Sequence, residues 1–290
     1  MTRPALPDCD RCENTRIMTV GGRGDVARAR RCVCYSDCPL CGGVGFFFET
    51  DAAGYRFTKP CQCTLVDRKI GYFNDARLPA RYAQARLKDF VPGVSGGLDP
   101  SAYAAGQAAF KFVTGFRPGR KGLLLHGPVG TGKTHLVVAV LRYLVIRLGV
   151  RVRFVEFLHL LADLRATFGD HGRAEDVMRP LVQVPVLAID ELGKGRGSDW
   201  ERDVLDELIS KRYNAGRTTL FTTNFPVEAP PQGRRGGFAP GTVARPKRRP
   251  DAAHEVLEDR VGTRIHSRLQ QMCEAHRING PDQRHQRPGD

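Results

Sequence analysis

One stretch decides the fold of this chain: Gly127-Pro128-Val129-Gly130-Thr131-Gly132-Lys133-Thr134. It fits the pattern G-x-x-x-x-G-K-[ST], in which small residues let the backbone fold tightly. Several N–H groups then point into one concavity that holds a polyphosphate. Lys133 adds a charge that reaches the β- and γ-phosphates, and Thr134 offers a hydroxyl to Mg²⁺. We therefore expect all eight residues to bind a nucleoside triphosphate, with ATP and Mg²⁺ as cofactors.

The segments on either side of this loop agree with that interpretation. Residues 121–126 (KGLLLH) predict a short buried strand that enters the loop. Residues 135–148 (HLVVAVLRYLVIRL) predict an apolar helix that leaves it. A chance glycine-rich turn, which is the alternative, would not explain this order of strand, loop and helix.

Composition limits the classes of protein to consider. The 290 residues suffice for one domain of about 200 residues and a smaller module. Lys and Arg number 45 against 31 Asp and Glu, and the net charge of +14 favours polyanionic partners, nucleic acid first, unless the proteome is basic throughout. There is no apolar run of membrane-spanning length and no apolar segment near the N-terminus that would direct secretion. We expect a cytoplasmic protein with no membrane partner.

All but one of the cysteines lie in the N-terminal part of the chain, where they form a tandem repeat. Each unit is a C-x-x-C pair followed, further along the chain, by a C-x-C pair. The second unit repeats the first, and one constant offset relates every cysteine to its counterpart. The first unit contains Cys9, Cys12, Cys32 and Cys34, and the second contains Cys38, Cys41, Cys61 and Cys63.

Two close pairs of thiolates suit tetrahedral Zn²⁺, so we expect about two zinc ions per chain. A hairpin between the pairs would bring them together, and in the second unit residues 46–50 and 55–58 predict its strands. Disulfides, an iron–sulfur cluster, or one ion shared by residues 32, 34, 38 and 41 are the alternatives. Because an all-cysteine site has no open position, the expected role is binding. Phe46, Phe47 and Phe48 either stack on bases or form the core of the hairpin.

The rest of the chain predicts the catalytic half of a nucleotide site. Residues 184–189 form an apolar strand that ends in Asp190-Glu191, which fits a Walker B segment. Asp190 would hold the water shell of Mg²⁺, and Glu191 would orient or deprotonate the attacking water. Residues 218–223 predict another strand, and Asn224 after it either contacts the γ-phosphate or the lytic water or caps a turn before Pro226.

Further elements follow from the pattern of apolar residues. Residues 151–156 predict a strand. Helices are expected over residues 65–84, with a break near Pro79, and over residues 100–116, 157–167, 199–213 and 252–275. Cys273 would be a buried thiol without function in the last helix, on which Arg260, Arg264 and Arg268 would share one face.

Four stretches, GPVGTGKTH, VPVLAIDELG, RYNAGRTTLFTTN and DRVGTRIHSRL, resemble the AAA+ ATPases of the bacterial helicase-loader type. This is the DnaC/DnaI family, with the IstB transposition helpers as close relatives, and the resemblance covers about residues 80 to 285. It implies an α/β fold: a P-loop NTPase (AAA+) parallel-sheet sandwich. We expect no helical lid of the kind found in larger AAA+ proteins, because the sequence printed after Arg268 is too short for one.

The resemblance also implies roles for individual residues. Lys133 and Thr134 match Walker A, Asp190 and Glu191 match Walker B, and Asn224 matches sensor 1. In related ATPases the arginine of an S-R-[LF] triplet acts on the nucleotide of the neighbouring subunit, so Arg268 is the expected arginine finger, with Arg264 second. Arg284 is a weaker match to a sensor 2 arginine. Self-association through the ATPase domain follows from this reading.

The cysteine repeat resembles a known module as well. The segment CPLCGGVGFFF…KPCQC is similar to the zinc module with which the loader of Gram-positive bacteria contacts the helicase. It also matches C-x-x-C-x-G-x-G of DnaJ cochaperones, but only once and without a J-domain. The expected organisation is a tandem zinc-binding β-hairpin module at 1–66, a helical connector and linker at 67–100, and an AAA+ domain at 101–285 with a disordered basic insertion at 227–250.

The function that these features imply is ATP hydrolysis by a helicase loader. The protein would act in DNA replication on single-stranded DNA, and its zinc module would grip a replicative helicase. Two alternatives stay open. One is a transposition helper that recruits a transposase, and the other is a zinc adaptor that uses ATP only as a switch.

Overall fold

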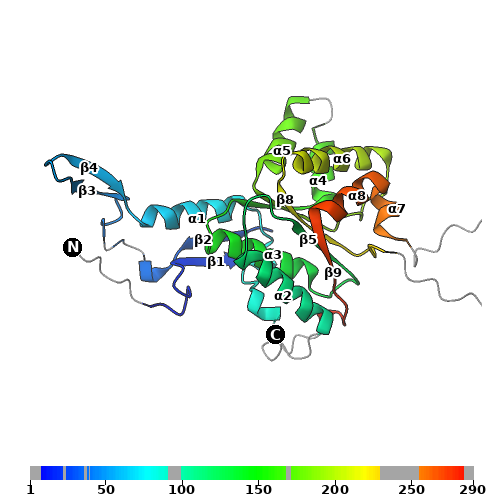
Figure 1. Ribbon diagram of the computed structural model, residues 1–290, viewed down its shortest axis with the longest axis horizontal. Helices are drawn as coiled ribbons and strands as arrows, with labels where there is room; N and C mark the ends of the chain where they lie inside the picture. The colour runs from blue at the N-terminus through cyan, green and yellow to red at the C-terminus, as the bar shows by residue number, and fades with distance from the viewer. Residues whose placement is uncertain are drawn as a thin grey trace, which may run out of the picture.

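The computed structural model describes residues 8–21, 24–35, 38, 40–90, 99–167, 171–228 and 255–283. Two small antiparallel hairpins come first in the chain, and an α/β sandwich follows (Figure 1). Residues 229–250 of the predicted basic insertion and the predicted sensor 2 residue Arg284 lie outside the described residues.

The sandwich is built on one parallel sheet of five strands in the order β6-β7-β8-β5-β9. Its strands are β5 (Gly122–His126), β6 (Val152–Glu156), β7 (Val186–Asp190), β8 (Thr218–Thr223) and β9 (Cys273–Arg277). Of the three central strands, β5 and β7 are apolar runs, and β8 (TTLFTT) is buried along its whole length, as a sheet covered on both faces requires. The predicted P-loop NTPase fold is therefore confirmed.

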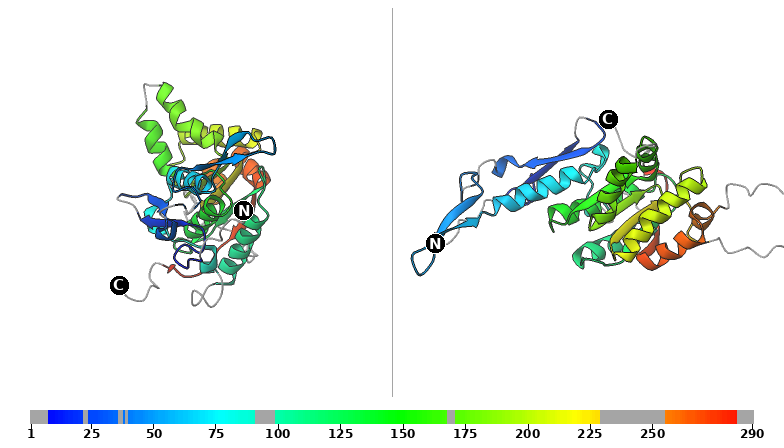
Figure 2. Two further views of the ribbon diagram at one scale, coloured as in Figure 1. Left: turned by 90° about the vertical axis from the view of Figure 1, so that its left-hand side faces the viewer. Right: turned by 90° about the horizontal axis from the view of Figure 1, so that it is seen from above.

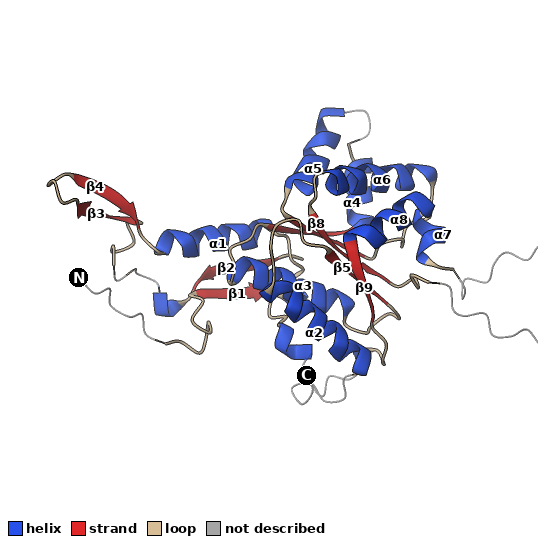
Figure 3. Cartoon of the chain, in the orientation of Figure 1, coloured by secondary structure: helices blue, strands red, loops and turns tan. Residues whose placement is uncertain are grey.

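Helices cover both faces of this sheet (Figure 3). They are α2 (Pro100–Thr114), α3 (Lys133–Ile146), α4 (Phe157–Arg165), α5 (His171–Gln183), α6 (Asp199–Asn214), α7 (Leu257–Val261) and α8 (Thr263–Met272). Helices α2 and α3 contribute to one apolar cluster, and α4 to α8 contribute to the other. Because the strands are parallel, the carboxyl ends of β5, β7 and β8 lie at the same edge of the sheet. The sequence predicts the nucleotide site at these three ends.

The prediction of one helix over residues 252–275 is wrong. Gly262 has a φ of 85° and separates α7 from α8. Residues 273–277 form β9, which pairs in parallel with β5, so the long-range pairing overrides the local helical pattern. Cys273 is buried as expected, but it lies in this strand, and its Sγ donates to the carbonyl of Thr219 at 3.2 Å. Helix α5 was not expected from the sequence.

The predicted connector is a shorter helix that packs on both of its neighbours. Helix α1 (Cys63–Asp75) ends before Pro79. It begins before the predicted boundary between the zinc module and the connector, at residues 66 and 67, and continues across it. It lies along β2 (Ala27–Arg31) of the first hairpin and against α3. Phe73 is fully buried in the same apolar cluster as the core of α3. Lys69 donates to the carbonyls of Ile146 and Arg147 at 2.9 and 3.1 Å, at the end of α3.

The first hairpin, β1 (Ile17–Gly21) and β2 (Ala27–Arg31), also packs against the ATPase domain. Glu13, in the cysteine knuckle before β1, pairs with two cations of the segment that follows α1 and with one cation of the ATPase domain. They are Arg86 at 2.8 Å, Lys88 at 3.2 Å and Arg147 at 3.6 Å. The first cysteine unit is therefore attached to the ATPase domain by apolar packing and by ion pairs.

A buried arginine joins α6 to the end of α5. Arg212 is fully buried, and its guanidinium donates to the carbonyls of Leu181 at 2.5 Å, Val184 at 2.9 Å and Thr218 at 2.6 Å. Burial, with a smaller effect of Arg217, lowers its pKa to about 9. The cation is stabilised by carbonyl dipoles, and each carbonyl would lose its partner if the guanidinium were removed.

We expect Arg212→Met to lower the free energy of unfolding by about 3 kcal/mol, because a buried acceptor left unpaired costs about 1–3 kcal/mol. Urea unfolding followed by circular dichroism measures this loss. The matched control is Arg217→Met on the exposed surface nearby, which should change stability by less than about 0.5 kcal/mol. Equal unfolding midpoints for the two variants would contradict the structural role of Arg212.

Candidate nucleotide and zinc sites

The phosphate-binding loop between β5 and α3 depends on its glycines. Gly127, Gly130 and Gly132 have φ values of 137°, 81° and 93°, which residues with a side chain rarely adopt. A Cβ at Gly127 would lie 2.1 Å from the carbonyl oxygen of Ile278, in the segment after β9. A Cβ at Gly130 would lie 2.1 Å from Cγ of Asp282. The C-terminal segment therefore lies directly against the loop, a contact that the sequence did not predict.

Lys133 is buried in this loop. Its ammonium donates to the carbonyls of Gly127 at 2.8 Å and Pro128 at 2.5 Å, and Thr131 donates to Pro128 at 3.0 Å. Helix α3 begins at Lys133 without a capping side chain on Gly132. The N–H groups of its first turn are therefore directed at the space in front of the loop, where an anion is stabilised.

The two predicted magnesium ligands meet across the loop and β7. The hydroxyl of Thr134 donates to both carboxylate oxygens of Asp190 at 3.0 Å. Asp190 is buried, and burial raises its pKa although hydrogen bonds from Thr222 and Thr134 lower it. A buried carboxylate beside a hydroxyl is the donor set that a hard divalent cation prefers. These residues therefore fit Mg²⁺, whose charge would compensate the buried carboxylate.

Glu191 follows Asp190 at the end of β7 and has a left-handed φ of 57°. Its backbone N–H donates to the hydroxyl of Thr222 at 3.0 Å, which turns the chain at this point. Its carboxylate lies 2.6 Å from the ammonium of Lys194. Burial and the nearby charge of Glu191 raise the pKa of Glu156 at the end of β6. Acidic groups of two neighbouring strands thus gather at the edge where the loop lies.

The predicted sensor residue lies at the same edge. Asn224 follows Thr223, the last residue of β8, and is partly exposed. The hydroxyl of Thr222 in the same strand donates to Asp190 and accepts from the backbone N–H of Glu191. The sequence did not lead us to expect Thr222 in the site. The available signal was its position in TTLFTT, shortly before Asn224.

The predicted finger arginines are tied to α6 and not to the loop of their own chain. Arg268 lies 2.6 Å from Asp206, and its side chain is only 18% exposed. Arg264 lies 3.5 Å from the other oxygen of Asp206 and is 73% exposed. Arg260 does not share their face, because Gly262 interrupts the helix and Arg260 donates to the carbonyl of Gly193 at 2.9 Å. Arg264 is therefore the more exposed of the two arginines of α8.

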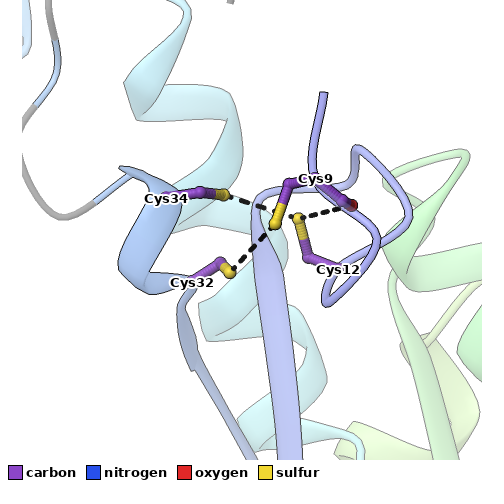
Figure 4. Close-up of side chains that lie close together, drawn as sticks. All are labelled: Cys9, Cys12, Cys32 and Cys34. Atoms are coloured by element: carbon purple, nitrogen blue, oxygen red, sulfur yellow. Dashed lines mark hydrogen bonds between the residues drawn. The ribbon is translucent and has the colours of Figure 1, made fainter. Parts of the chain in front are cut away.

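The eight N-terminal cysteines form two groups of four, each drawn from one repeat. Within each group the sulfur atoms all lie within 4.8 Å of one another. Figure 4 shows Cys9, Cys12, Cys32 and Cys34, in which Cys9 and Cys32 are 3.9 Å apart and Cys12 and Cys34 are 3.6 Å apart. The structure does not bring residues 32, 34, 38 and 41 together, so the grouping across the two repeats is not the one observed.

The second group has the same geometry. Sulfurs of Cys38 and Cys61 are 3.5 Å apart, as are those of Cys41 and Cys63. Four sulfurs around one Zn²⁺ at about 2.3 Å would be separated by about 3.8 Å. No disulfide joins the nine cysteines. The spacing and the donor set therefore fit a tetrahedral zinc ion in each group.

Neighbouring groups orient the sulfurs. Arg16 donates to Cys34 at 3.6 Å, and the backbone N–H of Gly45 donates to Cys41 at 3.2 Å. The hydroxyl of Tyr35, in the first unit, lies 3.4 Å from Cys38 of the second. Burial opposes ionisation of Cys38, but hydrogen bonds from Tyr35 and from the backbone lower its pKa to about 6. Tyr35 thus links the two sites, and Cys38 favours the thiolate that a metal requires.

Comparison with known proteins agrees with this geometry. The family described as IstB-like ATP binding protein matches residues 74–232, which is more than half of the chain. The chain belongs to this family. Its matched region includes the loop, the Walker B segment and β8. No helix among the described residues is long and apolar enough to cross a membrane.

Individual relatives point to two cellular settings. The replicative helicase loader DnaC of Escherichia coli is 28% identical over 121 residues, which are 41% of this chain and 49% of that protein. An ATP-binding protein in an insertion sequence of Mycobacterium tuberculosis is 32% identical over 145 residues, 49% of this chain and 54% of that protein. The chain thus spans about half the length of these curated relatives.

Solved structures show the same relationship. The crystal structure of the DnaC helicase loader is 30% identical and has a TM-score of 0.53, with 69% of this chain and 99% of that chain covered. The crystal structure of DnaI is 25% identical and has a TM-score of 0.50, with 70% and 93% covered. The expected likeness to the DnaC, DnaI and IstB proteins is confirmed.

Proposed function

We propose that this protein is an ATP-hydrolysing helicase loader of DNA replication. The observation that carries the ATPase part is the contact of Thr134 with Asp190 at 3.0 Å, next to Glu191 and behind a glycine loop shaped for phosphate. The similarity to DnaC over the ATPase domain supports the cellular role. In this proposal the protein acts on single-stranded DNA and its cysteine units contact a replicative helicase.

The chain's own residues divide the work of hydrolysis. Residues 127–134 bind the phosphates through backbone N–H groups and Lys133, whose ammonium must leave its carbonyl partners to reach them. Thr134 and Asp190 would hold Mg²⁺, which would supply positive charge to stabilise the phosphates. Glu191 leaves Lys194 and orients the attacking water, and Asn224 contacts this water or the γ-phosphate.

We expect Glu191→Gln to lower ATP turnover by about 10²–10⁴-fold while ATP binding is kept, because the amide cannot accept the proton of the water. Lys133→Ala removes the charge that binds the phosphates, so this variant should lose ATP binding as well. Steady-state turnover and the affinity for a fluorescent ATP analogue separate the two effects. Normal turnover in Glu191→Gln would exclude Glu191 as the base.

The site is completed by a neighbouring subunit in this proposal. Helix α8 supplies the arginine finger, and two residues are candidates. Arg268 matches the S-R-[LF] position but is held by Asp206, whereas Arg264 is exposed one turn earlier. We propose that Arg264 reaches the neighbour's nucleotide in the resting geometry and that Arg268 does so only when Asp206 releases it.

A second candidate function is favoured by the relative from an insertion sequence and by the IstB-like family itself. In that case the ATPase is the same, but the client is a transposase. Pull-down with purified proteins decides between the two. Capture of a hexameric replicative helicase supports loading, and capture of the transposase without the helicase overturns it.

The zinc adaptor with ATP only as a switch makes a different prediction. It would bind ATP but show no turnover, even with single-stranded DNA and the partner present. The presence of both Asp190 and Glu191 argues against it. Measurable hydrolysis that Glu191→Gln abolishes would exclude it.

A further inference from the structure

The tandem repeat of the cysteines continues through both hairpins. The constant offset that relates Cys9 to Cys38 also relates β1 to β3 (Phe46–Thr50) and β2 to β4 (Arg56–Pro60). The pairing register is equivalent too, since Ile17 faces Arg31 and Phe46 faces Pro60. Each position in one hairpin therefore has a structural counterpart in the other.

One face of the first hairpin packs against other segments of the same chain. This face, the Ile17 face, consists of Ile17, Thr19, Ala27 and Ala29, which are all buried. It joins the apolar cluster that contains Phe73 of α1 and the segment after that helix. The hydroxyl of Thr19 donates to the carbonyl of Ala83 at 2.8 Å. Segments of the same chain thus cover these four residues.

The counterpart in the second hairpin is uncovered. This face, the Phe46 face, consists of Phe46, Phe48, Arg56 and Thr58, which are all exposed. Phe46 and Phe48 are 41% and 58% exposed, and their rings make an edge contact at 5.9 Å. Arg56 lies 4.8 Å from the centre of the Phe48 ring. The two exposed rings and the arginine thus form one continuous group on this face.

The other face of the second hairpin is the one that is used inside the molecule. Phe47 on that face packs with the cluster of Tyr35, Cys38, Cys61 and Cys63, so it forms the small core around the second cysteine group. The hairpin projects away from the ATPase domain, beyond the start of α1 (Figures 1 and 2). The Phe46 face is therefore not needed for the fold of the unit and is directed to the outside.

We propose that the Phe46 face docks onto an α-helix with an apolar surface on a partner protein. The repeat supports this occupant, because the equivalent face of the first hairpin is covered by helical segments of its own chain. The two units then divide the work: the first attaches the module to the ATPase domain, and the second holds the partner. This inference rests on the proposed function, since it names the surface through which the cysteine units contact the helicase.

The charges of the second hairpin favour a protein over a nucleic acid. Its strands and turn contain two acidic residues, Glu49 and Asp51, and two basic residues, Arg56 and Lys59. Lys59 is paired with Glu49 at 2.9 Å. Nucleic-acid affinity depends largely on cations that neutralise phosphates, and this neutral hairpin has no surplus of them. Aromatic side chains with an arginine, in contrast, are typical of the centre of protein interfaces.

The test uses the full zinc-loaded chain and a double variant, Phe46→Ser with Phe48→Ser. The matched control is Phe57→Ser, which removes a phenylalanine that is 45% exposed on the opposite face of the same hairpin. Dissociation constants are measured for the purified replicative helicase, the purified transposase and a single-stranded oligonucleotide. Zinc content, measured in parallel, shows whether each variant is folded at the second site.

We expect the double variant to bind the helicase at least about tenfold more weakly, as for aromatic residues at the centre of an interface, and the control to change affinity less than twofold. Unchanged helicase binding by a zinc-loaded double variant would overturn the docking face and leave helicase loading intact. A transposase captured through Phe46 and Phe48, with no helicase binding, would keep the face and overturn loading. Oligonucleotide binding that needs both phenylalanines, or binding of neither protein by the unaltered chain, would overturn the docking proposal.

Discussion

Replacing Cys38 with serine is expected to remove one of the two zinc ions and to unfold the second hairpin. Structural zinc contributes about 10–16 kcal/mol of apparent binding free energy in small domains, and an isolated two-stranded hairpin is marginal at best. Because the outer face of this hairpin is exposed, little apolar packing remains when the metal is lost. Metal analysis should fall from about two zinc ions per chain to about one, and amides of β3 and β4 should exchange rapidly.

The equivalent change in the first unit should have a wider effect. Cys9→Ser removes the other zinc ion, and the Ile17 face of that unit belongs to the core shared with α1 and α3. We therefore expect a lower melting temperature of the whole chain for Cys9→Ser, and an unchanged main transition for Cys38→Ser. Cys273→Ser, in β9, is the control that should keep both zinc ions. Two zinc ions retained in either ligand variant would contradict the four-cysteine sites.

Replacing Arg264 with alanine is expected to lower DNA-stimulated ATP turnover by about 10³–10⁵-fold, the range for an arginine finger that acts in trans. The side chain is 73% exposed on α8, whereas Arg268 is held at 2.6 Å by Asp206. A trans-acting side chain must give up its contacts within its own subunit. Arg264 gives up only a contact with Asp206 at 3.5 Å, which is weaker than the contact of Arg268.

The comparison with Arg268→Ala decides which arginine acts. If Arg264 is the finger, Arg268→Ala should lower thermal stability through the lost contact with Asp206 and reduce turnover less than Arg264→Ala does. Mixing Arg264→Ala with Glu191→Gln subunits tests action in trans, since each variant then supplies the part that the other lacks. Restored turnover in the mixture is the expected result, and turnover that is unaffected by both arginine variants would exclude α8 as the source of the finger.

Much of the ATPase domain could be predicted from local sequence. The apolar runs before Gly127 and Asp190 are strands because a buried parallel strand needs apolar side chains on both faces. The constant offset between the cysteine units predicted two equivalent hairpins, and the strand bounds follow it. Spacing also predicted which cysteines share a metal, with one alternative that the structure does not show.

Other features depended on contacts between distant residues. The strand β9 exists because β5 offers it hydrogen bonds, although the sequence around Cys273 is compatible with a helix. Thr222 became part of the site because parallel pairing places β8 next to β7. The contact of Asp282 with Gly130 arises from the path of the chain after β9. Neither β9 nor the contact of Asp282 has a local sequence pattern that predicts it, and the position of Thr222 before Asn224 does not by itself indicate its contact with Asp190.

The sequence by itself thus determined the residues of the candidate sites: a glycine loop that fits phosphates, a carboxylate that fits Mg²⁺ and two sets of thiols that fit zinc. It did so because each of these needs particular residue types at short, fixed spacings. Only the tertiary structure decided how they are used. The Ile17 face packs inside the molecule, whereas its counterpart, the Phe46 face, is exposed. The ion pair with Asp206 holds Arg268, whereas Arg264 is exposed. Exposure depends on what packs nearby in space, and spacing along the chain does not encode it.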